Sequence, residues 1–357
     1  MEDESEVPDQ VPAQEEEEQE QQQQQQEEGE EQEETPPTDT NPPNEELDAA
    51  GQEERVPEEE EDAEEKIVEI GSILTAEAVG QHLSLLARTG NGLSHAYTRL
   101  EIHGKPIENI DVLETYLHLR YIDLSENGIV DISALASLEY LLSVDFHANK
   151  IKRIPASLDK RKYLQQANFA KNMIESIDII DWPMLAWLNM NENKLSAVNL
   201  QEFEELLHLE ARGNKITTTR GINSRKLEKL YLAGNQISTI ELEEKANLQI
   251  LHLRDNKITS LDGFHENLKS LTYLNLRNNL IEQFEEVWKL ASLPHLKTLN
   301  LSDNPVTKLP NYRLETIFRL KSLEKLDKEP VTDDEREEAE QFRPKTSATT
   351  QGDVAAV

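Results

Sequence analysis

The sequence predicts an α/β solenoid with a parallel sheet, and three observations support this fold class. The first is a recurring pattern, L-x-x-L-x-L-x-x-N-x-L, between Leu119 and Leu309. The second is the regular period, because the asparagines that mark the copies recur every 21 to 25 residues. These marker asparagines are Asn127, Asn149, Asn172, Asn193, Asn214, Asn235, Asn256, Asn279 and Asn304. The third is an apolar residue two positions after each asparagine, which returns the chain to the core. Together they define a leucine-rich repeat solenoid.

Each copy is expected to contribute one short strand and one polar turn. The L-x-L segment alternates with a period of two, which predicts a strand with one buried face. Strands of successive copies are expected to stack in parallel and to line the concave side of a curved body. The amide of each marker asparagine both donates and accepts, so we expect it to satisfy backbone groups of its own turn and of the neighbouring copy. No copy can bury its apolar side alone, so both ends need caps.

The N-terminal end of the solenoid is predicted to be a helical cap followed by an imperfect copy. Residues 73–88 carry apolar side chains at roughly helical spacing, with Thr75 as the expected N-cap and Gly90 and Gly92 as the expected stop. The stretch that follows repeats the pattern once more, with Lys105 in place of the asparagine. This degenerate copy brings the total to ten, and degeneracy is expected where one neighbour is missing.

The C-terminal end is predicted to be helical as well. The spacing between Asn279 and Asn304 stretches to 25 residues, and the added apolar residues predict a helix on the convex side. A further helix over 311–320 is expected to cover the open edge of the last strand. This end resembles the C-terminal cap of cytosolic and nuclear leucine-rich-repeat proteins related to the spliceosomal U2 A-prime protein and to the phosphatase-regulating repeat proteins.

The chain divides into five parts by composition and pattern. These are a disordered acidic tail (1–65), an N-terminal capping region (66–96), the repeats (97–310), a C-terminal cap with a following helix (311–343), and a disordered tail (344–357). The acidic tail holds 29 Asp and Glu against one basic residue, a net charge of −28 out of −35 for the whole chain. It cannot bury enough apolar surface to offset its ordering entropy. Two interpretations remain open: a solvated tail that keeps the protein soluble, or an electrostatic docking arm for a basic partner.

Charge and composition exclude several classes of function. The acidic balance argues against a nucleic-acid partner, since phosphate binding needs a basic stripe. The sequence has no cysteine, which predicts a reducing compartment. The first ten residues, MEDESEVPDQ, lack the basic and apolar regions of a signal peptide. There is also no run of about 18 apolar residues, so we expect no membrane span.

Motifs that carry chemistry are missing from the sequence. It has neither a G-x-x-x-x-G-K-[ST] loop nor a G-x-G-x-x-G that opens a helix. The nine histidines are scattered without metal-ligand spacing, and we expect His103 and His147 to be solvated surface residues. We therefore predict no enzymatic activity, no cofactor, no metal site and no small-molecule substrate.

The exposed side of the predicted sheet, here called the concave face, is the candidate interaction surface. Its side chains are those that lie between the strand leucines and point outward, and because every copy repeats at the same phase we expect them to form three rows along the stack. Its expected acidic end consists of Glu101, Asp123 and Asp145. Its expected basic end consists of Arg212, Arg254 and Arg277. Exposed aromatics and arginines are typical of protein interfaces, although an ordinary solvated surface could also carry them. The candidate residues are Tyr121, Asp123, Asp145, Trp187, Arg212, Tyr231, His252, Arg254, Tyr273 and Arg277.

We expect a partner segment, such as a helix, to lie along the concave face. Its basic end would lie over Asp123 and its acidic end over Arg254.

One segment outside the repeat consensus resembles a particular family. Residues 83–97 read LSLLARTGNGLSHAY, which is similar to the entry segment of a family of leucine-rich-repeat proteins of ciliary radial spokes. The resemblance continues through 118–127, 252–256 and 323–329, and it covers roughly 74–337. It implies a non-catalytic structural subunit of the third radial spoke of motile cilia and sperm flagella. Its implied partners are other radial-spoke and axonemal proteins, with no nucleic acid or membrane, and its implied location is the cytoplasm, in the cytoskeleton of the axoneme.

The tails depart from the pattern of that family. The acidic N-terminus here is longer and rich in glutamine, and the C-terminal tail is short. A contact that the family makes through its C-terminal tail is therefore not carried over. The alternative function is a cytosolic or nuclear scaffold of the same architecture, such as a phosphatase-regulating or ribonucleoprotein adaptor.

Overall fold

The structure, a computed structural model, covers the repeats and both of their ends. The described residues are 71–89, 92–177, 181–200 and 203–342. The two tails predicted at 1–65 and 344–357 lie outside them.

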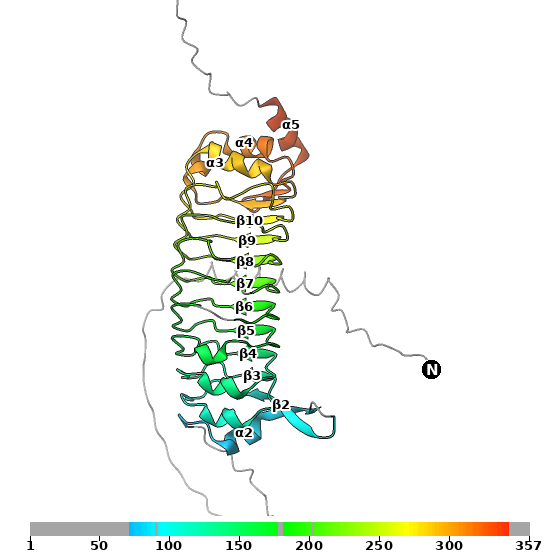
Figure 1. The fold of residues 1–357 in the computed structure, drawn as a ribbon. Coiled ribbons are helices and arrows are strands. Elements are labelled where there is room, and N and C mark those ends of the chain that lie inside the picture. The colour runs from blue at the N-terminus through cyan, green and yellow to red at the C-terminus, as the bar shows by residue number, and fades with distance from the viewer. Residues whose placement is uncertain (1–70, 90–91, 178–180, 201–202, 343–357) are drawn as a thin grey trace, which may run out of the picture. The chain divides into compact units, whose positions relative to one another are not determined.

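A single sheet joins all the repeats. Within the described residues it has thirteen strands, which follow one another in chain order (Figure 1). They are β1 (Leu83–Arg88), β2 (His95–Glu101), β3 (Tyr121–Asp123), β4 (Ser143–Asp145), β5 (Gln166–Asn168), β6 (Trp187–Asn189), β7 (His208–Glu210), β8 (Lys229–Tyr231), β9 (Ile250–His252), β10 (Tyr273–Asn275), β11 (Thr298–Asn300), β12 (Lys325–Leu326) and β13 (Glu329–Pro330). Strands β2 to β12 are parallel, whereas β1 and β13 run antiparallel to their neighbours. This confirms the predicted solenoid, with β2 to β11 as its ten copies.

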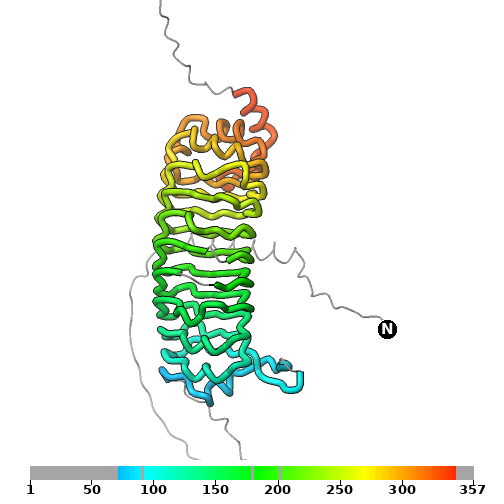
Figure 2. The backbone as a smooth tube through the Cα atoms, in the orientation of Figure 1, coloured from blue at the N-terminus to red at the C-terminus, as the bar shows by residue number. Residues whose placement is uncertain are grey.

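Helices are short and lie mainly at the two ends. The α-helices of the described residues are α2 (Ala76–His82), α3 (Phe284–Lys289), α4 (Tyr312–Arg319) and α5 (Asp333–Gln341). The 3-10 turns are η1 (Asp111–Thr115), η2 (Ser133–Ser137), η3 (Ala156–Leu158), η4 (Leu290–Ser292) and η5 (Pro305–Lys308). Helix α3 confirms the helix predicted between Asn279 and Asn304, and α4 confirms the helix predicted over 311–320. Figure 2 shows the backbone between the ends as successive coils, one above the other.

The marker asparagines connect each copy to its neighbours, as predicted. The side-chain Nδ2 of Asn172 donates to the carbonyl of Phe146 in the preceding copy at 2.8 Å and to that of Phe169 in its own copy at 3.1 Å. Its Oδ1 accepts from the backbone N–H of Ile151 at 2.9 Å. The same three contacts recur at the other buried asparagines, for example Asn256. One side chain thus satisfies one backbone donor and two backbone acceptors that would otherwise be buried without partners.

The core is one continuous apolar layer that runs through the stack. The strand leucines are fully buried, with Leu230, Leu251 and Leu274 at 0% exposure. Four aromatic side chains add an inner row, with centroid distances of 6.1 to 6.4 Å between successive rings. They are Phe146, Phe169, Trp182 and Phe203. Each copy therefore buries its apolar side against the copies above and below it.

The N-terminal cap differs from the predicted helix over 73–88. Thr75 is the N-cap, since its side chain accepts from the N–H of Ala78 at 3.2 Å, but α2 ends at His82. The chain then turns to extended geometry at Leu83 and forms β1, which pairs with β2. Pairing with the first copy's strand outweighs local helix spacing here, because it satisfies a row of backbone groups at the end of the sheet. Gly92 accordingly lies at the hairpin turn and not at a helix stop.

The C-terminal edge is also closed differently from the prediction. The edge of the last full strand, β11, is covered by β12 and β13, and not by α4. The carboxylate of Asp327 accepts from the N–H of Leu301 at 2.6 Å, in the place where a strand carbonyl accepts in the preceding copy. The hydroxyl of Tyr312 on α4 donates to the same carboxylate at 2.8 Å. Helix α4 thus positions the closing strand without capping the edge itself.

Candidate protein-interaction surface

The strand register places the candidate residues in three straight rows on the concave face. Tyr121, Trp187 and Tyr273 belong to a first row in which each residue is opposite its counterpart in the next strand. A second row contains Asp123, Asp145, Tyr231 and His252. The third row contains Arg212, Arg254 and Arg277, just beyond the strand ends, and backbone hydrogen bonds hold it in the same register. The predicted arrangement of rows is therefore confirmed.

The carboxylates at the acidic end have a structural role that the sequence did not reveal. Asp123 accepts from the N–H and the hydroxyl of Ser125, at 3.0 and 2.7 Å. Asp145 accepts in the same way from the N–H of His147 at 2.9 Å, and from its ring Nδ1 at 2.8 Å. Asn168 makes the equivalent contact one copy further on. Row-two Asp and Asn side chains thus cap the strand ends, so only part of each carboxylate remains available to a partner.

Three rings form a continuous stack near the other end of the concave face. His252 lies between Tyr231 and Tyr273, with ring centroids 4.9 and 4.8 Å apart. The guanidinium of Arg212 lies 4.6 Å from the centroid of Tyr231, a cation–π contact that extends the stack by one residue. We call these four side chains the concave stack.

His252 is neutral at physiological pH. Burial, followed by the nearby guanidiniums of Arg212 and Arg254, lowers the pKa of His252 to about 3. The imidazole therefore acts as a flat, uncharged ring between two tyrosines. The concave stack offers a partner an aromatic surface with a cation at its end, which is the composition of interface hot spots.

A glutamate that the sequence analysis did not select organises the centre of the concave face. Glu210 accepts from the indole Nε1 of Trp187 at 3.2 Å and from the side chain of Asn191 at 2.9 Å. Its carboxylate also lies 3.9 Å from the guanidinium of Arg212. It holds Trp187 on one side and Arg212, the cation of the concave stack, on the other. In the sequence, the role of Glu210 could be inferred only from its position in the second row, between Trp187 in the first row and Arg212 in the third.

The basic end is less strongly cationic than its sequence suggests. Arg254 forms an ion pair with Asp255 at 3.0 Å, and Nε of Arg277 donates to Asp303 at 2.8 Å. At the opposite end, Arg99 pairs with Glu101 at 3.1 Å. Because charged side chains at each end are already paired within the chain, the face would bind a partner mainly through its apolar and aromatic side chains.

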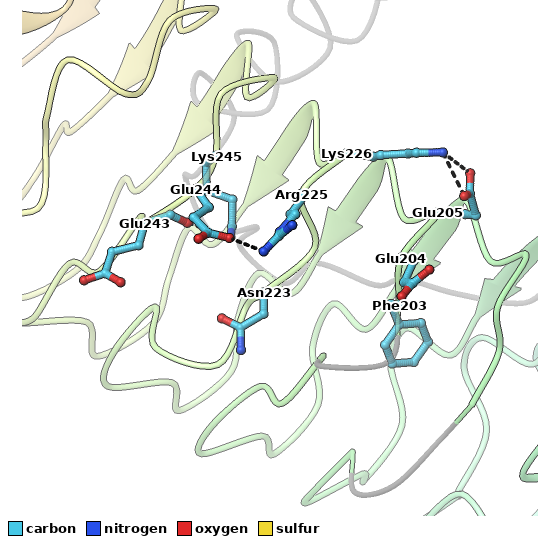
Figure 3. Close-up of a pocket in the computed structure, with 9 residues that line it drawn as sticks. All are labelled: Phe203, Glu204, Glu205, Asn223, Arg225, Lys226, Glu243, Glu244 and Lys245. Carbon is cyan, nitrogen blue, oxygen red and sulfur yellow. Dashed lines mark hydrogen bonds and ion pairs between the residues drawn. The ribbon is translucent and has the colours of Figure 1, made fainter.

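A hollow of about 740 Å³ lies on the side where the chain enters strands β7 to β9 (Figure 3). It occurs where Ser224 and Lys245 replace the large inner side chains of earlier copies, such as Phe203. Two ion pairs cross it: Lys226 to Glu205 at 2.6 Å, and Arg225 to Glu244 at 2.8 Å, both drawn in Figure 3. The hollow holds none of the predicted site residues, and its lining carries four carboxylates against three cations.

The described part of the chain meets neither of two structural requirements, a cluster of metal ligands and a membrane-spanning helix. Across residues 71–89, 92–177, 181–200 and 203–342, no group of three or more histidine, aspartate or glutamate side chains could hold a metal ion. None of the helices in these ranges combines the length and the apolar character that crossing a bilayer requires.

The repeats and their concave face define a leucine-rich-repeat protein, a class of generally non-catalytic scaffolds that bind other proteins. A family model described as leucine-rich repeat matches residues 199–355. Among solved structures, the functional domain of InlJ from Listeria monocytogenes shares this fold, with a TM-score of 0.54 at 23% identity. That match covers 64% of this chain and 48% of that chain.

Sequence comparison narrows the class to one family. Leucine-rich repeat-containing protein 23 of Bos taurus is 38% identical over 278 residues, which are 77% of this chain and 81% of that protein. The Xenopus tropicalis protein of the same name is 41% identical over 270 residues, 74% of this chain and 77% of that protein. The chain therefore belongs to the leucine-rich repeat-containing protein 23 family.

Proposed function

We propose that this chain is a non-catalytic structural subunit of the third axonemal radial spoke, where it holds other spoke proteins together and supports motility of cilia and flagella. The family membership and the resemblance of residues 83–97 to radial-spoke leucine-rich-repeat proteins support the assignment. A solenoid with one continuous core is stiff along its length, which suits an assembly that bends repeatedly.

The observation that carries the binding part of this proposal is the concave stack. Flat tyrosine and histidine rings supply a large contact area while losing little conformational freedom on binding. Glu210 holds the neighbouring Trp187, so the aromatic residues on this face are already placed before a partner arrives. The partner segment therefore contacts β6 to β10 mainly through apolar and aromatic side chains, with carboxylates near Arg254 and Arg277.

The location is tested by fractionating ciliated cells or sperm. If the proposal is correct, the chain stays with demembranated axonemes and is released together with radial-spoke proteins by strong salt. Recovery in the soluble cytosol with a phosphatase, or in the nucleus with ribonucleoproteins, would show that the alternative scaffold function is right.

The binding surface is tested by rebinding purified protein to axonemes from cells that lack it. Replacing Arg212, Arg254 and Arg277 with glutamate should weaken rebinding at least about tenfold, because the cation of the concave stack and its flanking charges are reversed. The control variant reverses three exposed cations outside the sheet, and so makes the same change in net charge. It carries Lys152→Glu, Arg153→Glu and Lys160→Glu. If both variants rebind like wild type, the concave face is not the binding surface.

A further inference from the structure

The β1–β2 hairpin is the one part of the described solenoid entrance that leaves the stack of repeats. Strands β1 and β2 span six and seven residues, whereas the strands of the following copies span three. Figure 1 shows the far end of this hairpin beside the stack and not within it, and the tube in Figure 2 follows the same path. At its turn, the N–H of Thr89 donates to the carbonyl of Ser94 at 2.8 Å. The hairpin is therefore longer than sheet formation in the repeats requires.

The hairpin exposes large apolar side chains that add nothing to the core. Leu86 and Tyr97 are opposite each other in the strand register and are 59% and 50% exposed. Leu85 is 49% exposed, and Leu93, just before β2, is 86% exposed. We call these four side chains the hairpin apolar patch. Several large apolar side chains exposed on one hairpin are typical of an interaction site, because leaving them in water is unfavourable.

The backbone at Leu85 has a conformation that side chains normally avoid. Its φ is +58°, in the left-handed region that glycine favours and that a branched apolar side chain seldom adopts. The hydroxyl of Thr98 donates to the carbonyl of Leu85 at 2.9 Å and holds the peptide in this position. The left-handed residue interrupts the alternation of β1, so the consecutive residues Leu85 and Leu86 are both exposed. A strained leucine that is half in water points to a function outside the fold.

The outer edge of β1 is open to another strand. In the strand order of the sheet β1 comes first, and within the described residues no strand pairs with its outer side. An exposed apolar edge strand offers a row of backbone donors and acceptors to an incoming chain. Addition of an extended peptide to such an edge is a common mode of recognition, with backbone hydrogen bonds for affinity and side chains for specificity.

We propose that an extended segment of a partner protein adds as a further strand to the outer edge of β1 and buries the hairpin apolar patch. Since side chains of a strand alternate between its two faces, the segment carries apolar residues at every second position. Arg88, opposite His95 in the register, lies at the turn end of the hairpin and fits a carboxylate at one end of that segment. This docking site lies at the β1 end of the sheet, whereas the rings of the concave stack lie on β8 to β10.

A second copy of the chain is a less suitable occupant of the same edge. Each chain has a net charge of −35, and −28 of it is carried by the 65 residues that precede the solenoid in sequence. Pairing two β1 edges about a two-fold axis would bring two such chains together and oppose association by like-charge repulsion. An apolar strand from another protein meets no such opposition.

The test uses full-length protein and axonemes from cells that lack it, with Leu86→Ser and Tyr97→Ser combined in one variant. We expect at least about tenfold weaker rebinding with an unchanged thermal melting temperature, since both side chains are half-exposed. Leu93→Ser should also weaken rebinding. Because Leu93 is more exposed than Leu86 or Tyr97, a loss of binding in this variant cannot be ascribed to a loss of folding. The matched control is Leu280→Ser, which removes a leucine that is 48% exposed in a distant copy.

A second measurement distinguishes strand addition from simple side-chain contact. Hydrogen exchange of the salt-extracted complex should show new protection of the β1 amides, compared with the free protein. Wild-type rebinding that the hairpin variants leave unchanged would overturn this proposal while leaving the spoke assignment intact. Failure of the wild type to rebind would instead count against the spoke assignment. Complexes without new β1 protection, or a wild-type dimer in analytical ultracentrifugation that the variant abolishes, would also overturn strand addition by a partner.

Discussion

Replacing Asn193 with alanine should cost this protein a large part of its stability. Asn193 lies near the middle of the stack and is 7% exposed. Its Nδ2 donates to the carbonyl of Phe169 at 2.8 Å, and its Oδ1 accepts from the N–H of Ile174 at 2.9 Å. Alanine leaves both groups buried without these partners, and each such loss costs about 1–3 kcal/mol. We therefore expect the free energy of unfolding to fall by about 2–5 kcal/mol.

The assay is urea unfolding followed by circular dichroism, with two comparison variants. Asn127→Ala should cost less, because this asparagine is only half-buried and water can replace part of its contacts. Asn193→Asp keeps an acceptor for the N–H of Ile174 but places a charge against the carbonyl of Phe169, so it should be no better than alanine. A loss below about 0.5 kcal/mol for Asn193→Ala would refute the reasoning, since that is the range of a surface substitution.

Three further results are expected. Leu230→Ala should lower the free energy of unfolding by about 2–5 kcal/mol, because removing a fully buried side chain leaves a cavity. Trp187→Ala should instead weaken partner binding with little change in melting temperature. If both variants lost the same amount of melting temperature, the interface assignment would be contradicted. Arg313 lowers the pKa of Glu335 to about 2, so their pairing stabilises the C-terminal cap above the ordinary pKa of 4.5 and is lost as the pH falls towards 2. The difference in melting temperature between wild type and Glu335→Gln should therefore shrink over that pH range, and a constant difference would argue against the linkage. Burial lowers the pKa of Lys245, which is 2% exposed, so its positive charge opposes folding. Lys245→Met should therefore raise the urea concentration at the midpoint of unfolding. A lower midpoint would show that the buried amino group stabilises the fold.

The repeat count, the strand positions and the rows of the concave face followed from the sequence by itself. In a solenoid each copy pairs with the next at the same phase, so spacing along the chain fixes the register in space. Tyr121, Trp187 and Tyr273 therefore belong to one row by their spacing from the marker asparagines alone. The buried contacts of the marker asparagines followed for the same reason, because every copy repeats them.

The two ends could not be derived in this way, since there the repetition stops. Residues 83–88 have apolar spacing that suits either a helix or a strand, and only the presence of β2 beside them decides for β1. At the other end, Asp327 takes the place of a strand carbonyl, at a turn where both Asp327 and Lys328 have positive φ.

The chemistry of the concave face was likewise decided by tertiary structure. The sequence supplied Tyr231, His252 and Tyr273 as members of rows, but their stacking depends on side-chain angles between neighbouring copies. The hydrogen bonds of Glu210 with Trp187 and Asn191, and the pairing of Arg277 with Asp303, join side chains that are 19 or more residues apart in sequence. The period of the chain thus determines where the backbone goes, whereas the contacts that tune charge and shape arise only when different copies lie side by side.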